Sequence, residues 1–218
     1  MDQKARHARS KSRPDPGRTG SGPGKATRDK LIDAALVAFA EHGFRGASVR
    51  EIGEAVGMTF PLVTYHFGSK ENLWLAVAER ALSEIVELGQ SFEIPDDSDP
   101  RERMQAYFRM TLQDSTRHPE RRRILAQISA RNEKSAIGAL APLLAEFQQR
   151  STERIQRLID MGFPTRLTAK EVQMVLRGLL ASNASAPLGA AALFGFRSSK
   201  ALVEFQTELL MKIITNGK

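Results

Sequence analysis

Apolar residues recur at three- and four-residue steps along most of the chain after residue 26, the spacing that places them on one face of an α-helix. The first such face comprises Ile32, Ala35, Leu36 and Phe39. We find no strand-length alternation of apolar and polar residues bounded by turn residues. The pattern therefore predicts an all-α fold of about nine helices.

Capping residues mark the place where two short helices meet. Ser48 and Glu51 have the spacing of a capping box, in which each side chain bonds an unpaired backbone N–H at a helix start. Gly57 can adopt the positive φ that ends this helix. Thr59 can cap the next helix, with Pro61 tolerated in its first turn. The pair is a helix-turn-helix candidate.

The same signals place the remaining helices. A first helix, capped by Thr27 and ended by Gly43, would complete a three-helix N-terminal head. A long helix capped by Ser69 would leave this head and enter a larger helical-bundle body, so it would link the two mechanically. The other helices are expected from Asp99 to about Arg117, from Glu120 to Arg131, from Ser135 to Met161, from the Thr168–Glu171 capping box onward, and through Leu202 to Ile213.

The second helix of the pair has an unusual composition. From Phe60 to His66 it offers aromatic, aliphatic, hydroxyl and imidazole side chains without an acidic residue, and Lys70 follows. Such a surface can approach a phosphate backbone closely. A tightly packed hairpin of a larger bundle would also account for it.

Between residues 57 and 73 the chain reads Gly-Met-Thr-Phe-Pro-Leu-Val-Thr-Tyr-His-Phe-Gly-Ser-Lys-Glu-Asn-Leu. This resembles the TetR family of tetracycline-repressor-like regulators, whose typical pattern is a glycine, a recognition helix ending in aromatic-His/aromatic-Phe, and Ser/Asn-Lys-Glu-x-Leu. The resemblance extends from about Lys25 to Leu75, and Thr64 departs from it by standing where the family most often has an aromatic residue. It implies a sequence-specific transcriptional regulator, a repressor released by an apolar or amphipathic small molecule.

The resemblance also implies roles in DNA binding. Arg50 would read a base, and arginine suits bidentate contact with guanine. Val63 and Phe67 would pack inward. The implied major-groove contacts are Phe60, Pro61, Leu62 and Thr64, and the implied phosphate contacts are Ser48, Thr59, Tyr65, His66 and Lys70.

The body is expected to hold an effector pocket and a dimer interface. Similar regulators bind small molecules between the helices that correspond to Asp99–Gly162, and they form homodimers through their last two helices. The uncharged stretch Gly178–Phe196 is too rich in small residues for a membrane span but would allow close helix packing. The candidate pocket residues, each of a type more often found in plain core, are Met104, Phe108, Ile128 and Phe147.

The net charge of +7 over 218 residues is concentrated near the N-terminus. Residues 1–24 hold six Lys or Arg and two Asp, whereas residues 25–72 are neutral. The predicted organisation is a disordered basic tail at 1–24, a helix-turn-helix DNA-binding domain at 25–72, and an effector-binding and dimerisation domain at 73–218. The tail would be either a solvated leader or an arm that contacts DNA.

Catalytic and metal-binding chemistry has little support in the sequence. Cysteine is absent, the four histidines are scattered without metal-ligand spacing, and no hydrolase, zinc-protease or dinucleotide motif occurs. We therefore expect no enzyme activity, no cofactor and no metal, and, without an apolar leader, a cytoplasmic protein with no membrane contact. Two alternatives stay open: a non-specific architectural DNA-binding protein, and a helical small-molecule-binding protein or enzyme.

Overall fold

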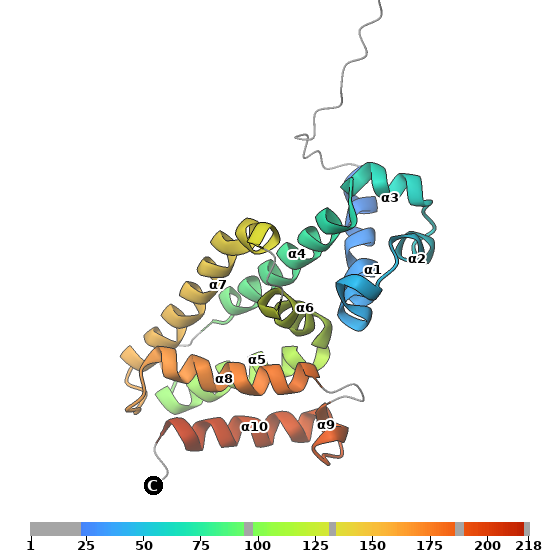
Figure 1. Ribbon diagram of the computed structural model, residues 1–218. Coiled ribbons are helices and arrows are strands. Elements are labelled where there is room, and N and C mark those ends of the chain that lie inside the picture. The colour runs from blue at the N-terminus through green and yellow to red at the C-terminus, as the bar shows by residue number, and fades with distance from the viewer. Residues whose placement is uncertain (1–22, 94–97, 131–133, 186–189, 216–218) are drawn as a thin grey trace, which may run out of the picture.

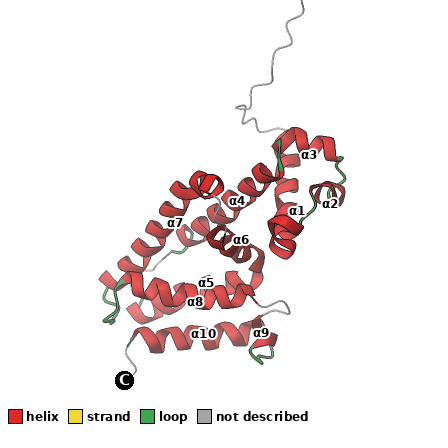
Figure 2. Cartoon of the chain, viewed as in Figure 1, coloured by secondary structure: helices red, strands yellow, loops and turns green. Residues whose placement is uncertain are grey.

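The computed structural model describes residues 23–93, 98–130, 134–185 and 190–215, and within these ranges the chain forms helices and no strand (Figure 2). The predicted all-α class is confirmed, and the short α9 adds to the helices that the sequence indicated. The helices are α1 (Pro23–Gly46), α2 (Val49–Ala55), α3 (Phe60–Phe67), α4 (Lys70–Gln90), α5 (Pro100–Arg117), α6 (Pro119–Ala130), α7 (Lys134–Asp160), α8 (Ala169–Ser185), α9 (Ala190–Leu193) and α10 (Ser199–Ile214).

The three-helix head lies at one end of the molecule, and α4 runs from it into the body (Figure 1). Helix α1 begins at Pro23, before the expected cap at Thr27, because proline fits the first helical turn. The predicted tail otherwise lies outside the described residues. Helix α1 is interrupted at Gly43, whose φ of 68° is not helical, as expected for the glycine that ends it.

The turn between α2 and α3 depends on two glycines. Gly57 has a φ of 71°, a conformation that L side chains rarely adopt. A Cβ on Gly53 would lie 2.9 Å from both the Met58 carbonyl oxygen and the Val63 Cγ2, so a larger residue would push the helices apart. The Met58 N–H donates to the Gly53 carbonyl at 2.9 Å, which closes the turn. The close approach of α2 and α3 therefore requires glycine at position 53.

The three predicted caps at Ser48, Thr59 and Ser69 differ in their side-chain bonds. The Ser48 Oγ accepts a hydrogen bond from the Glu51 N–H at 3.3 Å, as the capping-box spacing indicated. Thr59 occupies the N-cap position of α3, but its side chain makes no capping bond. Ser69 caps α4 by accepting from the Asn72 N–H at 3.1 Å. The hydroxyl of Thr59 is thus left exposed at the start of α3.

The head and the first body helices share one hydrophobic core. Phe39 of α1 and Trp74 of α4 are fully buried, and the Phe44 ring lies 6.2 Å from Phe39 and 6.3 Å from Trp74. The same cluster takes in Ile124 of α6 and Leu140 of α7. Apolar packing therefore continues across the boundary that the sequence suggested at residue 72. The head and the first body helices are in direct contact through this core.

A second core joins α5, α8 and α10, which lie alongside one another at the far end of the molecule from the head (Figure 1). A buried polar bridge sits inside it. Asn183 and Gln206 exchange two amide hydrogen bonds of 3.0 and 2.8 Å, and Asn183 also donates to the Ser115 Oγ at 3.0 Å. Because buried amides must be paired, these three residues fix how the three helices stand against one another.

Helix α8 begins at the predicted capping box and ends well before residue 196. The Thr168 N–H donates to the Glu171 carboxylate at 2.7 Å, and the Glu171 N–H donates to the Thr168 Oγ1 at 3.3 Å.

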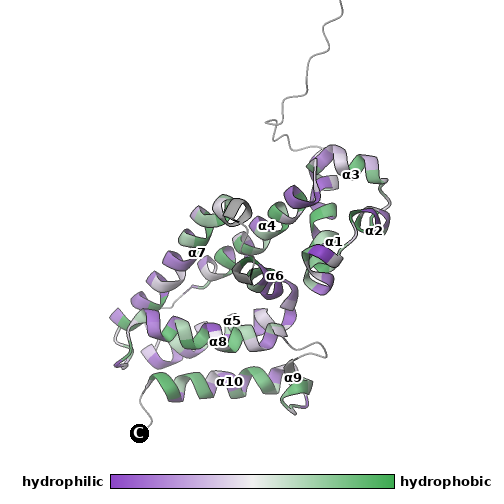
Figure 3. Cartoon of the chain, in the orientation of Figure 1, coloured by the Kyte–Doolittle hydropathy of each residue, from purple (hydrophilic) through white to green (hydrophobic). Residues whose placement is uncertain are grey.

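Helix α10 is apolar along much of its length (Figure 3). Among the described residues, even so, no helix is both long and apolar enough to cross a bilayer.

Candidate nucleic-acid interface and ligand cavity

Helix α3 presents large apolar side chains to solvent. Phe60, Leu62 and Tyr65 are 52%, 40% and 74% exposed, whereas Val63 and Phe67 are buried against the head, as predicted. Three exposed large side chains on one short helix are unusual for a surface that stays in water. The exposed face of α3 is therefore a candidate binding surface.

The polar residues predicted around α3 are also accessible. The Arg50 side chain is 78% exposed and its Nε lies 2.9 Å from the Glu54 carboxylate, one turn along α2. Pro61 and Thr64 are exposed, and His66 is half-buried with its ring 5.6 Å from that of Tyr65. A solvent-exposed ion pair of this kind contributes little to stability, so Arg50 can exchange Glu54 for another partner at small cost.

Lys70 has structural contacts that the sequence did not indicate. Its Nζ donates to the Arg45 carbonyl oxygen at 3.2 Å and lies 5.2 Å from the centre of the Phe44 ring. These contacts hold the end of α1 against the start of α4. The role of Lys70 as a phosphate contact stays a prediction, and so do the other contacts carried over from the family.

Arg28 of α1 is a candidate that sequence reasoning missed. Its guanidinium lies 5.0 Å from the centre of the Phe67 ring at the end of α3, and its side chain is exposed. This places a positive charge beside the recognition helix, where it can meet a phosphate. No spacing signal could have found it, because residues 28 and 67 meet only after α1 packs behind α3.

A line of ion pairs runs from the head into the body along α4. Arg80 lies 3.4 Å from Asp29 and 3.8 Å from Asp33, both on α1, and 2.6 Å from Glu84 on its own helix. Hydrogen bonding to Glu84 raises the pKa of Arg80. Two acidic groups of the head therefore share one cation of α4 with Glu84.

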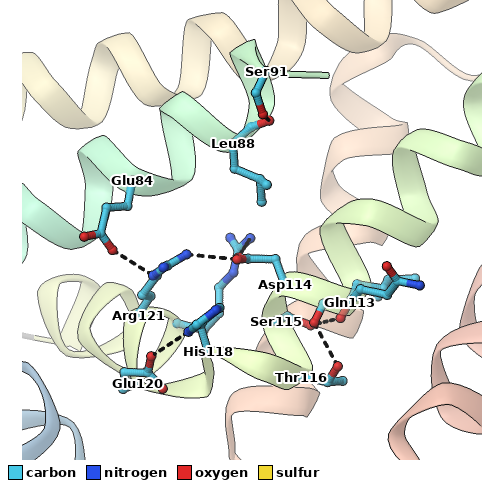
Figure 4. Close-up of polar contacts among 12 residues, drawn as sticks. Glu84, Leu88, Ser91, Gln113, Asp114, Ser115, Thr116, His118, Glu120 and Arg121 are labelled. Atoms are coloured by element: carbon cyan, nitrogen blue, oxygen red, sulfur yellow. Dashed lines mark hydrogen bonds and ion pairs between the residues drawn. The ribbon is translucent and has the colours of Figure 1, made fainter. Parts of the chain in front are cut away.

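The line continues from α4 to α6 and α5 (Figure 4). Arg121 lies 2.8 Å from Glu84 and 2.9 Å from Asp114. The other oxygen of the Asp114 carboxylate lies 3.8 Å from the Arg122 guanidinium. Since Asp114 is 8% exposed and Arg122 is 7% exposed, the far end of the line is buried.

Arg122 also lines a cavity of about 260 Å³ whose wall is formed by helices α4 to α8. Of the four predicted pocket residues, Phe147 lines it, whereas Met104, Phe108 and Ile128 are almost fully buried in the hydrophobic clusters and do not. The apolar lining includes Ile85, Leu88, Leu125, Leu144, Ile155 and Leu176. Their place was missed because apolar period alone does not distinguish a cavity wall from filled core.

The described residues bring together no group of three or more His, Cys, Asp or Glu side chains able to hold a metal ion. Two candidate sites result: the exposed face of α3 in the head and the arginine-lined cavity in the body.

Together these features describe a helix-turn-helix head joined by one long helix, α4, to a helical body that holds a cavity. Residues 31–77 match the model of bacterial regulatory proteins of the tetR family. The head is therefore similar to that of the tetR family over these residues, as the resemblance around residues 57–73 implied.

A curated relative, the HTH-type transcriptional repressor AcnR of Corynebacterium glutamicum, is 40% identical over 62 residues, which make up 28% of this chain and 33% of AcnR. The match therefore spans about a third of that relative's length.

Two solved structures extend the likeness to the whole fold. A tetR-family regulatory protein from Rhodococcus RHA1 has a TM-score of 0.70 at 13% identity, covering 89% of this chain and 98% of its own. The regulator FadR of Bacillus subtilis, solved with stearoyl-CoA, has a TM-score of 0.64 at 14% identity, covering 87% of this chain and 98% of its own.

Arg50→Ala is expected to relax sequence preference at one base position by about 1–3 kcal/mol, because a bidentate contact with a base would be lost. Affinities for a set of single-base variants of the bound site would measure this. Glu54→Ala is the matched control, since it removes the ion pair of Arg50 and leaves the guanidinium in place. A uniform loss of affinity across all sequences would instead assign Arg50 to the phosphate backbone.

Proposed function

We propose that this protein is a sequence-specific transcriptional repressor that binds a near-palindromic DNA operator as a homodimer and is released by a small molecule. The observation that carries the proposal is α3, which keeps Phe60, Leu62 and Tyr65 uncovered on a helix without acidic residues. Apolar groups at these positions suit contact with thymine methyl groups in the major groove. AcnR, the relative with the similar segment, is a transcriptional repressor by name.

The proposed dimer forms through α8 and α10. Met174 of α8 is 73% exposed, and Phe205 and Ile213 of α10 are 50% and 44% exposed. Gly178 follows Met174 by one turn on the outer side of α8 and is small enough to let a partner helix approach closely. Exposed apolar side chains on two adjacent helices favour burial against a second copy of the chain.

The proposed release by a ligand uses the cavity and the line of ion pairs. Arg122 stands in the cavity wall and faces Asp114, which shares Arg121 with Glu84 of α4. A ligand that draws Arg122 away from Asp114 would alter the pairing on α4, and α4 carries the head. The resulting shift of α3 would spoil the spacing of the two recognition helices. FadR, a neighbour in fold, was solved with the small-molecule ligand stearoyl-CoA.

Selection of genomic fragments with the purified protein, followed by footprinting, tests the proposal. We expect a protected site with two-fold symmetry and half-sites roughly one helical turn apart, because each protomer supplies one recognition helix. Leu62→Glu should abolish protection without unfolding the protein, because the residue is exposed and the added charge would face phosphates.

The outcomes distinguish the alternatives. Protection that vanishes under excess competitor DNA would indicate a non-specific architectural protein. An absence of DNA binding at any salt concentration, together with binding of a small molecule, would indicate a helical carrier or enzyme.

A further inference from the structure

The cavity in the body is small and its lining is mostly apolar. Its volume of about 260 Å³ lies just below the roughly 300–1,000 Å³ that is usual for pockets of drug-sized ligands. Leu88 of α4, Leu125 of α6 and Leu144 of α7 contribute to its wall, and Phe147 adds an aromatic ring. A compact apolar body fits this space better than a long or strongly polar one.

The charge of the lining is one-sided. Among the described residues, four arginines line the cavity and no Asp or Glu does. One of them, Arg150, is already paired with Glu146 at 2.6 Å, and its side chain is 48% exposed, so it belongs to the outer rim. The other three, Arg122, Arg154 and Arg177, come from three different helices and converge on the cavity.

Arg122 is the most buried of the three. It is 7% exposed, and its Nε and Nη2 have no hydrogen-bond partner within the part of the chain that the structure describes. Its acid neighbour, Asp114, stands at 3.8 Å and is already hydrogen-bonded to Arg121. Burial lowers the pKa of Arg122 to about 10, so it stays charged at neutral pH. A buried cation with free donors is costly unless an anion reaches it.

Arg154, Arg177 and Tyr107 surround the same space. Arg154 donates one hydrogen bond to the Phe92 carbonyl at 3.2 Å, and the Arg177 guanidinium lies 5.3 Å from the centre of the Phe147 ring. Burial lowers the pKa of both arginines and raises that of the Tyr107 phenol, which is therefore a neutral hydrogen-bond donor. Within the part of the lining that the structure describes, the Nε and Nη2 of Arg122 are the buried donors left without a partner.

We propose that the cavity binds a compact organic carboxylate, whose carboxyl group pairs with the free donors of Arg122 and whose apolar body lies against Leu125, Leu144 and Phe147. Planar guanidinium and carboxylate groups match in geometry and form the stronger, charge-assisted class of hydrogen bond. The ligand class rests on the cavity alone. Its role as the effector rests on the proposed function.

Matched acid and amide pairs test the proposal by isothermal titration calorimetry. The probes are octanoate with octanamide and naphthoate with naphthamide, which differ in charge and little in shape, and naphthyl phosphate as a second kind of anion. We expect the better-fitting carboxylate to bind roughly 10- to 100-fold more tightly than its amide, the factor that a hydrogen bond to a charged group contributes. Comparing octanoate with naphthoate shows whether the cavity prefers an aliphatic or an aromatic ligand body.

Variants of the arginines assign the effect. Arg122→Met should remove the preference for the acid while retaining binding of the amide. If this variant fails to fold, Arg122→Lys replaces it in the test and should keep part of the preference. Arg150→Gln is the matched control and should retain the full preference. Equal binding of acid and amide by the unaltered protein, tighter binding of the phosphate, or no binding of either carboxylate would overturn the proposal.

DNA binding of each variant, measured without ligand, separates this proposal from the proposed function. Loss of the acid preference in Arg122→Met supports the ligand class. Because Arg122 pairs with Asp114 in the proposed release, operator binding by this variant is expected to weaken, and operator binding by the unaltered protein decides the proposed function. A protein that prefers carboxylates and binds no DNA would refute the proposed function alone.

Discussion

Asp114→Ala is expected to destabilise the protein by about 3–5 kcal/mol, the usual cost of removing one partner from a buried ion pair. The Asp114 carboxylate lies between Arg121 at 2.9 Å and Arg122 at 3.8 Å. Without it, Arg121 keeps Glu84 at 2.8 Å, but Arg122 loses the one acidic partner that the described residues give it. Urea unfolding followed by circular dichroism would measure the change.

The second substitution Arg122→Met gives this prediction an internal control. In Asp114→Ala combined with Arg122→Met, the uncompensated charge is gone, so most of the lost stability should return. If the single variant loses less than about 1 kcal/mol, the change of an ordinary surface substitution, the ion pair is not the buried unit described here. If the double variant is no more stable than the single, the loss comes from packing around residue 114.

Met174→Glu combined with Ile213→Glu is expected to give a monomer that binds the operator about 100-fold or more weakly than the unaltered protein, because a monomer engages one half-site at a time. Both side chains are exposed, on α8 and α10 respectively, so the fold of the single chain should tolerate the change. In a dimer formed through these helices, like charges would be brought together and desolvated.

Sedimentation and operator titration on the same samples would check this result. Ala145→Glu, at an exposed position of α7, is the matched control and should leave both the dimer and the affinity unchanged. A doubly substituted protein that stays dimeric would move the interface away from α8 and α10. A monomer with unchanged operator affinity would contradict the requirement for two recognition helices.

The helices and the turn of the head follow from local sequence. A cap such as Ser48 or Thr168 acts on backbone groups within three residues, and Gly57 is required by a backbone angle at its own position. The inward packing of Val63 and Phe67, implied by the family resemblance, agrees with their four-residue spacing on one helix face. Such features were predicted because the interacting groups are neighbours in the sequence.

The cavity shows the opposite behaviour. Met104 and Phe108 have the same apolar character as Phe147, yet they fill the core while Phe147 borders the open space. Whether an apolar residue faces a partner or a void depends on how far apart its neighbouring helices stand. That distance is set by packing among five helices, so the apolar periodicity of a single helix does not predict it.

The sequence by itself thus determined the class of the fold, the helix-turn-helix and the residues that α3 turns outward, because capping and helical period are local. Only the tertiary structure brought Arg28 beside Phe67, aligned Asp29, Arg80, Glu84 and Arg121, and placed Arg122 in the cavity wall. Apart from the Arg80–Glu84 pair within α4, these contacts join residues from different helices. Residues that are far apart in the sequence come together only on folding, and for Asp114 and Arg122 folding also removes most of the surrounding water, which strengthens their interaction.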